Sequence, residues 1–340
     1  MERPYFASVT AYGARFTDAA YWRPYVATIC SRHGLLPCHR IRAGLPGTHP
    51  VFIVDGRYVV KLFTHRFNGA RSFAVESDLY PLLAGTWGVP APSLLARGHL
   101  FPEDGGWPWP YLVSALIPGR SLGEVRERVG LADQLALAAH LGPIVRQIHA
   151  LPVTRVPSLT RSWGAYACLL DVRRASCADD YARGGGMPPP LLEGIAAYLP
   201  PTETLIDQSR QPCLLHGDLN EDHVLGRFER GRWQITGIID FGDAQVGDPL
   251  YELVALHLGA FRCNKQLLRT FLGAYGSTDG QPEHFAAHMM RLTLLHEFTV
   301  LGRVFEEFPL ARTVRSLAEL ATLLWDLGQP GLSDSNQTFA

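Results

Sequence analysis

The sequence predicts an α+β protein with a small β-rich N-terminal part and a larger, mainly helical C-terminal part. Three stretches with strand character lie in the first third of the chain: 51–54, 58–63 and 111–116. After Leu116, apolar residues recur mostly at helical spacing, as in 131–150. We therefore predict an N-lobe over residues 1–113, a C-lobe over residues 114–340 and a hinge at about 112–118 between them.

Composition narrows the possible partners. The chain has 340 residues, 47% of them hydrophobic, and a formal net charge of −1, so it carries no basic footprint for nucleic acid or a membrane surface. No stretch approaches the ~18 apolar residues of a membrane span, and the first residues lack the order of a signal peptide. The six cysteines form no Cys-x-x-Cys pair, which favours free thiols. We expect a cytoplasmic protein with no obligate protein partner.

In the N-lobe, Asp55-Gly56 joins two strand-like stretches, and this pair is a strong hairpin signal because both residues tolerate positive φ. Asn68 is predicted to cap a helix that runs to about Ala84, with Gly85 as its stop.

In the C-lobe, Pro118-Gly119 ends the strand at 111–116, and a helix is expected over 131–150. Cys177 to Pro190, rich in glycine and proline, is predicted to be a loop. Further helices are expected near 249–261, 264–275, 282–305 and 313–327.

Lys61 and Glu76 are expected to form a pair. Lys61 lies near the end of a strand, and Glu76 lies in an apolar helical stripe with Phe73 and Tyr80. Burying a polar group without a partner costs roughly 2–7 kcal/mol, and a charge costs more, so Glu76 needs a partner. Lys61 is the nearest candidate upstream. The alternative is that Glu76 reaches water at the edge of the stripe.

The segment 214–225, followed by 238–243, carries the strongest chemical signal. Asp218 follows a histidine, His223 comes five residues later, and Asp240 closes an apolar strand. This is the order of catalytic base, first metal ligand and second metal ligand in protein kinases. Phosphoryl transfer needs an acceptor hydroxyl held in line and a divalent metal that neutralises charge, and these residue types supply both. His216 is expected to be structural.

His223 is the exception in this pattern, because kinase catalytic loops carry asparagine there. Three alternatives stay open: the imidazole binds the metal through nitrogen, an active-site water intervenes, or the site is impaired. A histidine without any function is the plain alternative to all three. Imidazole suits Mg²⁺ less well than an amide oxygen does. Asp248 is expected to cap the next helix, with Pro249 at its first position.

These motifs resemble the aminoglycoside phosphotransferase family, which has a protein-kinase-like bilobal fold. A closer likeness is to hygromycin-B 7″-O-kinase. The stretches that carry the closer likeness span about residues 50 to 300: Val60-Lys61-Leu62-Phe63, Ala74-Val75-Glu76-Ser77, Trp107-Pro108-Trp109-Pro110, Leu256 to Arg262 and Leu294 to Phe298.

The resemblance implies ATP (or GTP) bound between the lobes, with Mg²⁺ or Mn²⁺. Adenine would meet the backbone near Ser114 and Leu116, and Lys61, steadied by Glu76, would meet the α- and β-phosphates. No Gly-x-Gly-x-x-Gly loop is present; the segment from Gly44 to Pro50 occupies its place, and Thr48 within it is expected to offer a hydroxyl and an N–H to a phosphate.

The acceptor is expected to lie against the helical lobe. A polycationic aminocyclitol would need carboxylates there, and the candidates are Glu297, Glu306, Glu307 and the acids of 171–180. The leading hypothesis is an ATP-dependent O-phosphotransferase of an aminoglycoside such as hygromycin B, conferring antibiotic resistance. The alternatives are a kinase of a macrolide or an endogenous metabolite, and a nucleotide-binding pseudokinase-like module.

Overall fold

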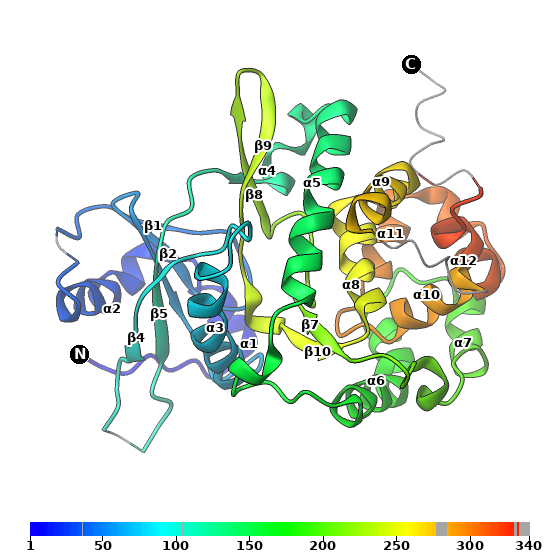
Figure 1. The fold of residues 1–340 in the computed structure, drawn as a ribbon. Coiled ribbons are helices and arrows are strands. Elements are labelled where there is room, and N and C mark those ends of the chain that lie inside the picture. The colour runs from blue at the N-terminus through cyan, green and yellow to red at the C-terminus, as the bar shows by residue number, and fades with distance from the viewer. Residues whose placement is uncertain (36, 104, 277–283, 330–331, 333–340) are drawn as a thin grey trace. The chain divides into compact units, whose positions relative to one another are not determined.

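The computed structural model describes the whole chain except residues 36, 104, 277–283, 330–331 and 333–340. The chain divides into two compact units (Figure 1). Unit 1 consists of Met1–Gly119 and Thr236–Asp243, and unit 2 of Arg120–Ile235 and Ala244–Ala340.

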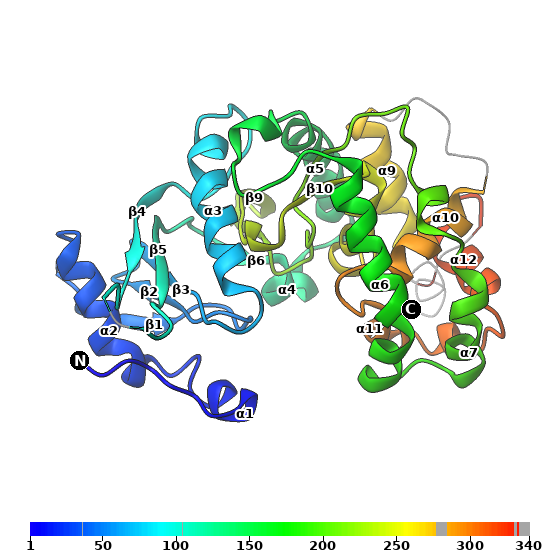
Figure 2. The ribbon, with the colours of Figure 1, turned by 90° about the horizontal axis from the view of Figure 1, so that it is seen from below.

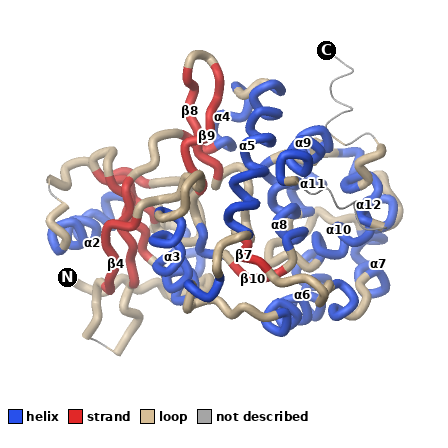
Figure 3. The backbone as a smooth tube through the Cα atoms, viewed as in Figure 1, coloured by secondary structure: helices blue, strands red, loops and turns tan. Residues whose placement is uncertain are grey.

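Unit 1 is built on a five-stranded sheet with the order β1-β2-β3-β5-β4, in which neighbouring strands are antiparallel. Its strands, red in Figure 3, are β1 (Ile41–Ala43), β2 (Val51–Val54), β3 (Tyr58–Leu62), β4 (Leu94–His99) and β5 (Pro110–Ala115). The predicted hairpin is confirmed: Val54 pairs with Tyr58, and Asp55 and Gly56 have φ of 51° and 66°.

The helices of unit 1 are α1 (Val9–Gly13), α2 (Ala19–Arg32) and α3 (Gly69–Ala84). α2 packs through Trp22 into a core that includes Phe52 and Val60, and Figure 2 shows α3 on the opposite side of the sheet. The predicted bounds of α3 are confirmed, but the expected capping bond is wrong. Asn68 adopts φ 54° and its side chain makes no cap hydrogen bond, so the helix begins at a left-handed residue.

Unit 2 is mainly helical, as predicted. Its α-helices are α4 (Leu122–Val125), α5 (Leu131–His149), α6 (Trp163–Gly184), α7 (Pro189–Tyr198), α8 (Pro249–Ala255), α9 (Lys265–Tyr275), α10 (Phe285–Leu294), α11 (Leu301–Glu307) and α12 (Leu317–Trp325). A π-helix, η5 (Leu256–Ala260), continues α8. Among the described residues, the 3₁₀ turns are η1 (Arg126–Arg128), η2 (Val153–Arg155), η3 (Thr202–Leu205), η4 (Phe241–Asp243) and η6 (Pro309–Arg312).

Short strands accompany these helices: β6 (Arg120–Ser121), β7 (Cys213–Leu215), β8 (Val224–Glu229), β9 (Arg232–Ile238) and β10 (Gln245–Gly247). β10 pairs with β7, and β6, β8 and β9 form a second small sheet. The predicted cap of α8 is confirmed, because the Asp248 side chain accepts from the N–H of Leu250 and Pro249 opens the helix.

The predicted loop from Cys177 to Pro190 is confirmed only at residues 185–188, because α6 covers 177–184 and α7 begins at Pro189. α6 continues to Gly184 because Cys177 and Tyr181 bury one face of the helix. Asp180 accepts from Arg173, two turns earlier in α6, at 2.6 Å, which adds an ion pair along the helix. Gly185, the cap residue directly after α6, has φ 69°.

The predicted helix over 282–305 is also wrong, because α10 and α11 are separate; residues 282 and 283 lie outside the described part. His296 lies in the break, where its Nδ1 accepts from the N–H of Phe298 at 3.2 Å. A side chain that bonds its own neighbouring backbone competes with helical hydrogen bonds. In the described ranges, no helix combines the length and hydropathy that crossing a bilayer requires.

Candidate active site

Three charged side chains meet in unit 1. Nζ of Lys61, on β3, lies 2.7 Å from Oε1 of Glu76 on α3 and 2.7 Å from Oδ1 of Asp240 after β9. Glu76 is fully buried, and Lys61 has 9% of its surface exposed. The buried partner expected for Glu76 is therefore present. The pairing of Lys61 with Asp240 was not predicted.

Burial and charge act in opposite directions on this group. Burial raises the pKa of Glu76 to about 7, against the attraction of Lys61. Burial alone would lower the pKa of Lys61, but the carboxylates of Asp240 and Glu76 outweigh it and raise that pKa above its ordinary value. Lys61 therefore stays a cation between two acids at neutral pH.

The segment that carries Asp240 is fixed to unit 1 by its own contacts. The N–H of Ile238 donates to the carbonyl of Pro90 at 2.7 Å, and the ring of Phe241 packs edge-on against Tyr80. Asp240 has φ 64°, a conformation that costs energy for a residue with a side chain. These contacts hold the strained residue with its carboxylate at Lys61.

Gly242 shows how closely this segment approaches α3. A Cβ placed on Gly242 would lie 3.1 Å from Cβ of Ser72 and 3.4 Å from Oε1 of Glu76. Nη1 of Arg71, one residue before Ser72, donates to the Gly242 carbonyl at 3.3 Å. A side chain at position 242 would therefore push on Ser72 and Glu76 by a few tenths of an ångström, so glycine suits this close approach.

In unit 2, a loop runs from β7 to β8, and its first residues are fixed from two sides. The carboxylate of Glu252, on α8, accepts from the N–H of His216 at 2.7 Å and of Gly217 at 3.3 Å. On the other side, Nε2 of the buried His296 donates to the Gly217 carbonyl at 3.2 Å. Gly217 has φ 84°, which favours glycine at this turn.

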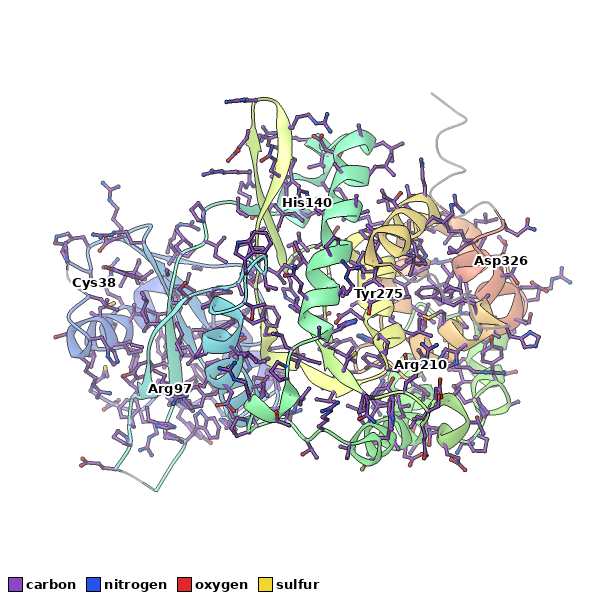
Figure 4. The ribbon with its side chains drawn as sticks, viewed as in Figure 1. Cys38, Arg97, His140, Arg210, Tyr275 and Asp326 are labelled. Carbon is purple, nitrogen blue, oxygen red and sulfur yellow. The ribbon has the colours of Figure 1, made fainter. Side chains whose placement is uncertain are left out.

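The charge of Glu252 is stabilised although the residue is buried. Burial alone would raise its pKa, but His149, the nearby imidazole of His216 and the hydrogen bonds together lower the pKa of Glu252. Nε2 of His149 lies 3.5 Å from Oε2 of Glu252. The other ring nitrogen of His149 lies 2.9 Å from the hydroxyl of Tyr275, which is labelled in Figure 4.

Asp218 follows this anchored turn. Its Oδ1 accepts from Nδ2 of Asn220 at 3.1 Å, and its side chain is 17% exposed. His216 is buried, and its Nδ1 accepts from the N–H of Asp218 at 3.3 Å. These contacts agree with the structural role expected of His216.

The ring of His223 has a defined tautomer. Nδ1 of His223 lies 2.6 Å from the backbone carbonyl of Asp218. Because a carbonyl only accepts, Nδ1 carries a hydrogen, and in the neutral ring Nε2 then has the lone pair. A backbone carbonyl that fixes one ring nitrogen in this way is the usual support for a metal ligand that uses the other nitrogen.

The remaining residues predicted to bind nucleotide all lie in unit 1. Thr48 is exposed, and its carbonyl accepts from the Tyr12 hydroxyl at 2.7 Å. Ser114 is buried within β5, between β3 and β4. The N–H of Leu116 donates to the carbonyl of Arg57 at 2.8 Å, so this donor is already used within the unit.

The acids predicted to receive the acceptor are not gathered into one cluster. Glu307 pairs with Arg303 at 2.6 Å and lies 3.8 Å from Arg262. Glu306 is exposed, and Glu297 is half-buried with its N–H donating to the hydroxyl of Tyr251. The acids of 171–180 lie on α6, not in a loop; among them Asp171 accepts from Thr202 and Asp180 pairs with arginines.

The residues proposed to hold a divalent metal have suitable chemistry but do not form a complete set. In the part of the chain that the structure describes, no three side chains of His, Cys, Asp or Glu gather closely enough to hold a metal ion. Mg²⁺ is commonly held by one or two carboxylates together with substrate phosphates and water. Asp240, in unit 1, offers a carboxylate of this kind, and His223, in unit 2, offers an imidazole.

Comparison with solved structures identifies the architecture as the kinase-like bilobal fold, with an N-terminal antiparallel sheet and a helical C-terminal part. Aminoglycoside 2′-phosphotransferase-IIIa, in its GDP complex, superimposes with a TM-score of 0.63 at 22% identity, covering 93% of this chain and 99% of that one. Macrolide 2′-phosphotransferase MphH from Brachybacterium faecium gives a TM-score of 0.54 at 20% identity, with 88% and 98% covered.

The family follows from the sequence. The profile of the phosphotransferase enzyme family matches residues 45–288, and the chain belongs to this family. Among curated proteins, the lysine-specific demethylase JMJ21 of Arabidopsis thaliana is 24% identical over 271 residues, which are 64% of this chain. The match covers 29% of the length of that plant protein.

Proposed function

We propose that this protein is a nucleotide-dependent small-molecule O-phosphotransferase, which moves the terminal phosphoryl group of ATP or GTP to a hydroxyl of an antibiotic or metabolite. The observation that carries the proposal is the contact of Lys61 with both Glu76 and Asp240. A buried lysine between two acids can contact nucleotide phosphates. Asp240, the acid after β9, could then bind a metal ion in place of Lys61.

The proposed reaction has a simple balance. The acceptor oxygen forms a bond to the terminal phosphorus, the bond from that phosphorus to the bridging oxygen breaks, and a nucleoside diphosphate leaves. Asp218 accepts the proton of the acceptor hydroxyl, and its hydrogen bond from Asn220 orients the carboxylate for this role. A bound Mg²⁺ or Mn²⁺ would neutralise charge on the phosphates, with Asp240 and His223 as its protein ligands.

The nucleotide is proposed to bind the N-lobe, residues 1–113, up to the hinge at about 112–118, with the C-lobe, residues 114–340, holding the acceptor. Thr48, Ser114 and Leu116 remain the proposed contacts for phosphate and base. Since the N–H of Leu116 already donates to Arg57, we propose that its carbonyl faces the base. The related structures were determined with GDP, ADP or ATP, which supports a purine nucleotide.

For the acceptor, we propose first an aminoglycoside hydroxyl, as in hygromycin B. The enzyme would then act in the cytoplasm and make its host resistant to the antibiotic. Relatives bind kanamycin and gentamicin, which supports this class. Glu297, Glu306 and Glu307 are the proposed contacts for its ammonium groups.

A macrolide or a metabolite with few positive charges is the second candidate. It is favoured by a specific observation: Glu307 and Asp180, two of the expected acids, are already paired with arginines. An acid neutralised in this way attracts a polycation less strongly. The fold shared with a macrolide 2′-phosphotransferase is compatible with this acceptor.

The test is turnover of a panel of aminoglycosides, macrolides and metabolites by the wild type, Asp218→Ala and the exposed control Asp207→Asn. We expect Asp218→Ala to lose at least ~10²-fold in kcat, the usual contribution of a positioned base. Asp207→Asn should retain the wild-type kcat. Full turnover by Asp218→Ala would remove Asp218 from this role, and nucleotide binding without turnover of any acceptor would favour the pseudokinase-like alternative.

A further inference from the structure

Glu221, three residues after Asp218, lies in a cage of arginines that the sequence did not predict. Its Oε2 accepts from Nε of Arg126 at 2.5 Å and from Nε of Arg262 at 3.2 Å. Its Oε1 accepts from Nη2 of Arg262 at 3.1 Å and from Nη2 of Arg303. The three arginines come from η1, from the turn after η5 and from α11.

The cage is buried and charged. The side chain of Glu221 is 4% exposed and that of Arg126 is 11% exposed. Burial alone would raise the pKa of Glu221, but the three guanidinium groups outweigh it and lower that pKa to about 2. Three guanidinium groups therefore surround one carboxylate, and their hydrogen bonds hold it in place.

The backbone around Arg262 has an unusual conformation, and the Arg262 side chain contacts Glu221 from it. Arg262 and Cys263 follow the π-helix η5 and have φ of 45° and 58°, values that L-residues rarely adopt. Nη2 of Arg126 donates to the carbonyl of Ala260, the last residue of η5, at 2.5 Å. Single π-helical turns and strained residues occur often at functional sites, where the surrounding contacts hold them.

Glu221 is also fixed through its backbone and through its neighbours. Its carbonyl accepts from the N–H of Gly123 at 3.1 Å. The preceding residue, Asn220, donates to the carboxylate of Asp218, and the side-chain oxygen of Asn220 accepts from the N–H of Asp222 at 2.9 Å. A shift of Glu221 would therefore move the groups that orient Asp218.

We propose that Glu221 is a positioning residue for the catalytic loop, and that Arg126, Arg262 and Arg303 are the clamp that holds it. The cage acts on the half of the loop between Asp218 and His223, whereas Glu252 and His296 hold the half before Asp218. The proposal rests on the proposed function in one respect, since the loop is called catalytic because Asp218 is the proposed base.

The test compares Glu221→Gln and Arg303→Gln with a matched control, Asp133→Asn, in the full chain. Asp133 is a buried carboxylate that also accepts from an arginine, Arg232, and from the N–H of Trp233 at 3.0 Å, but it lies on α5. The glutamine at 221 would turn an amide toward three guanidinium groups. Arg303→Gln removes the most exposed arm of the cage and keeps the other two.

Two readouts separate positioning from general stability. Hydrogen–deuterium exchange of a peptide spanning 214–224 should rise in Glu221→Gln and, less, in Arg303→Gln, and stay at the wild-type rate in Asp133→Asn. In turnover, kcat should fall roughly 10- to 100-fold in Glu221→Gln, as for a misplaced catalytic group, while the nucleotide KM stays within about twofold. If Glu221→Gln fails to fold, the same two measurements on Arg303→Gln and Asp133→Asn decide between positioning and general stability.

The opposite results would overturn the proposal: wild-type exchange and kcat in both cage variants, or an equal loss of kcat in Asp133→Asn. The exchange measurement needs no acceptor. If the wild type turns over no acceptor, the proposed function fails, yet faster exchange confined to the cage variants would still support Glu221 as the residue that holds the loop.

Discussion

Lys61 holds two carboxylates at the same distance, with Nζ 2.7 Å from Oε1 of Glu76 and 2.7 Å from Oδ1 of Asp240. Glu76 is fully buried, whereas the side chain of Asp240 is 37% exposed. The buried acid is therefore the structural partner of Lys61, and the more exposed Asp240 is the one that we propose as a metal ligand.

This relationship predicts how replacement of Lys61 acts. Lys61→Met leaves Glu76 buried without its cation, and breaking a buried pair in this way costs about 3 kcal/mol of unfolding free energy. Adding Glu76→Gln replaces the unpaired buried carboxyl group with an amide that does not titrate, so the double variant should recover part of the stability but not the nucleotide affinity. Urea denaturation and nucleotide titration measure the two effects. Recovery of both together would contradict a role of Lys61 in nucleotide binding.

The tautomer of His223 predicts a metal preference. If Nε2 is a metal ligand, an imidazole nitrogen should favour Mn²⁺ over Mg²⁺ more than an amide oxygen does. His223→Asn should therefore lower the ratio of Mn²⁺- to Mg²⁺-supported turnover, and chelation of the metal should abolish turnover in both proteins. An unchanged ratio in His223→Asn would count against direct coordination.

Part of this site could be predicted from the sequence because it depends on local constraints. A glutamate within an apolar helical stripe needs a buried partner, which identified Lys61 for Glu76. The contact of Lys61 with Asp240 could not be predicted, since it depends on a positive φ at Asp240 and on packing of Phe241 against Tyr80. No single-residue preference encodes either feature.

The fold shows the same division between local and distant causes. The hairpin at Asp55-Gly56 follows from two residues that tolerate positive φ, and the structure confirms it. The end of α6 was misplaced because glycine and proline dominate the composition after Cys177, whereas buried contacts of Tyr181 extend the helix. The cage around Glu221 was missed because its arginines come from distant parts of the chain.

Buried histidines predict a loss of stability in mild acid. Burial lowers the pKa of His257 to about 3, although Nε2 donates to the carbonyl of Leu324 at 3.0 Å. Below its ordinary pKa of about 6.5 the unfolded chain binds a proton that the folded one does not, so stability falls as pH falls from 6.5 toward 3. One such histidine costs about 2 kcal/mol between pH 6.5 and pH 5.

The variant His257→Gln tests whether His257 causes part of this loss of stability in acid. Between pH 6.5 and pH 5, the variant should lose stability less steeply than the wild type does. The difference in slope of the unfolding free energy against pH should correspond to the uptake of about one proton on unfolding. Urea denaturation at several pH values measures it. Exposed His140, replaced in the same way, is the control and should leave the slope at the wild-type value; parallel curves for all three proteins would show that His257 takes up its proton in the folded state.

Glu252 should support the loop that carries Asp218 without affecting nucleotide binding. Its carboxylate accepts the N–H groups of His216 and Gly217 in a buried position, and a hydrogen bond to a charged group contributes about 1.5–3 kcal/mol. Glu252→Gln keeps one acceptor oxygen but loses the charge, so we expect a loss of about 2 kcal/mol in unfolding free energy and a lower kcat. Nucleotide affinity should stay unchanged, because Lys61, Glu76 and the segment of Asp240 form their contacts within unit 1.

Glu229→Gln, on the exposed end of β8, is the matched control for stability. A fall in nucleotide affinity equal to the fall in kcat would argue that Glu252 supports the whole protein and not the loop.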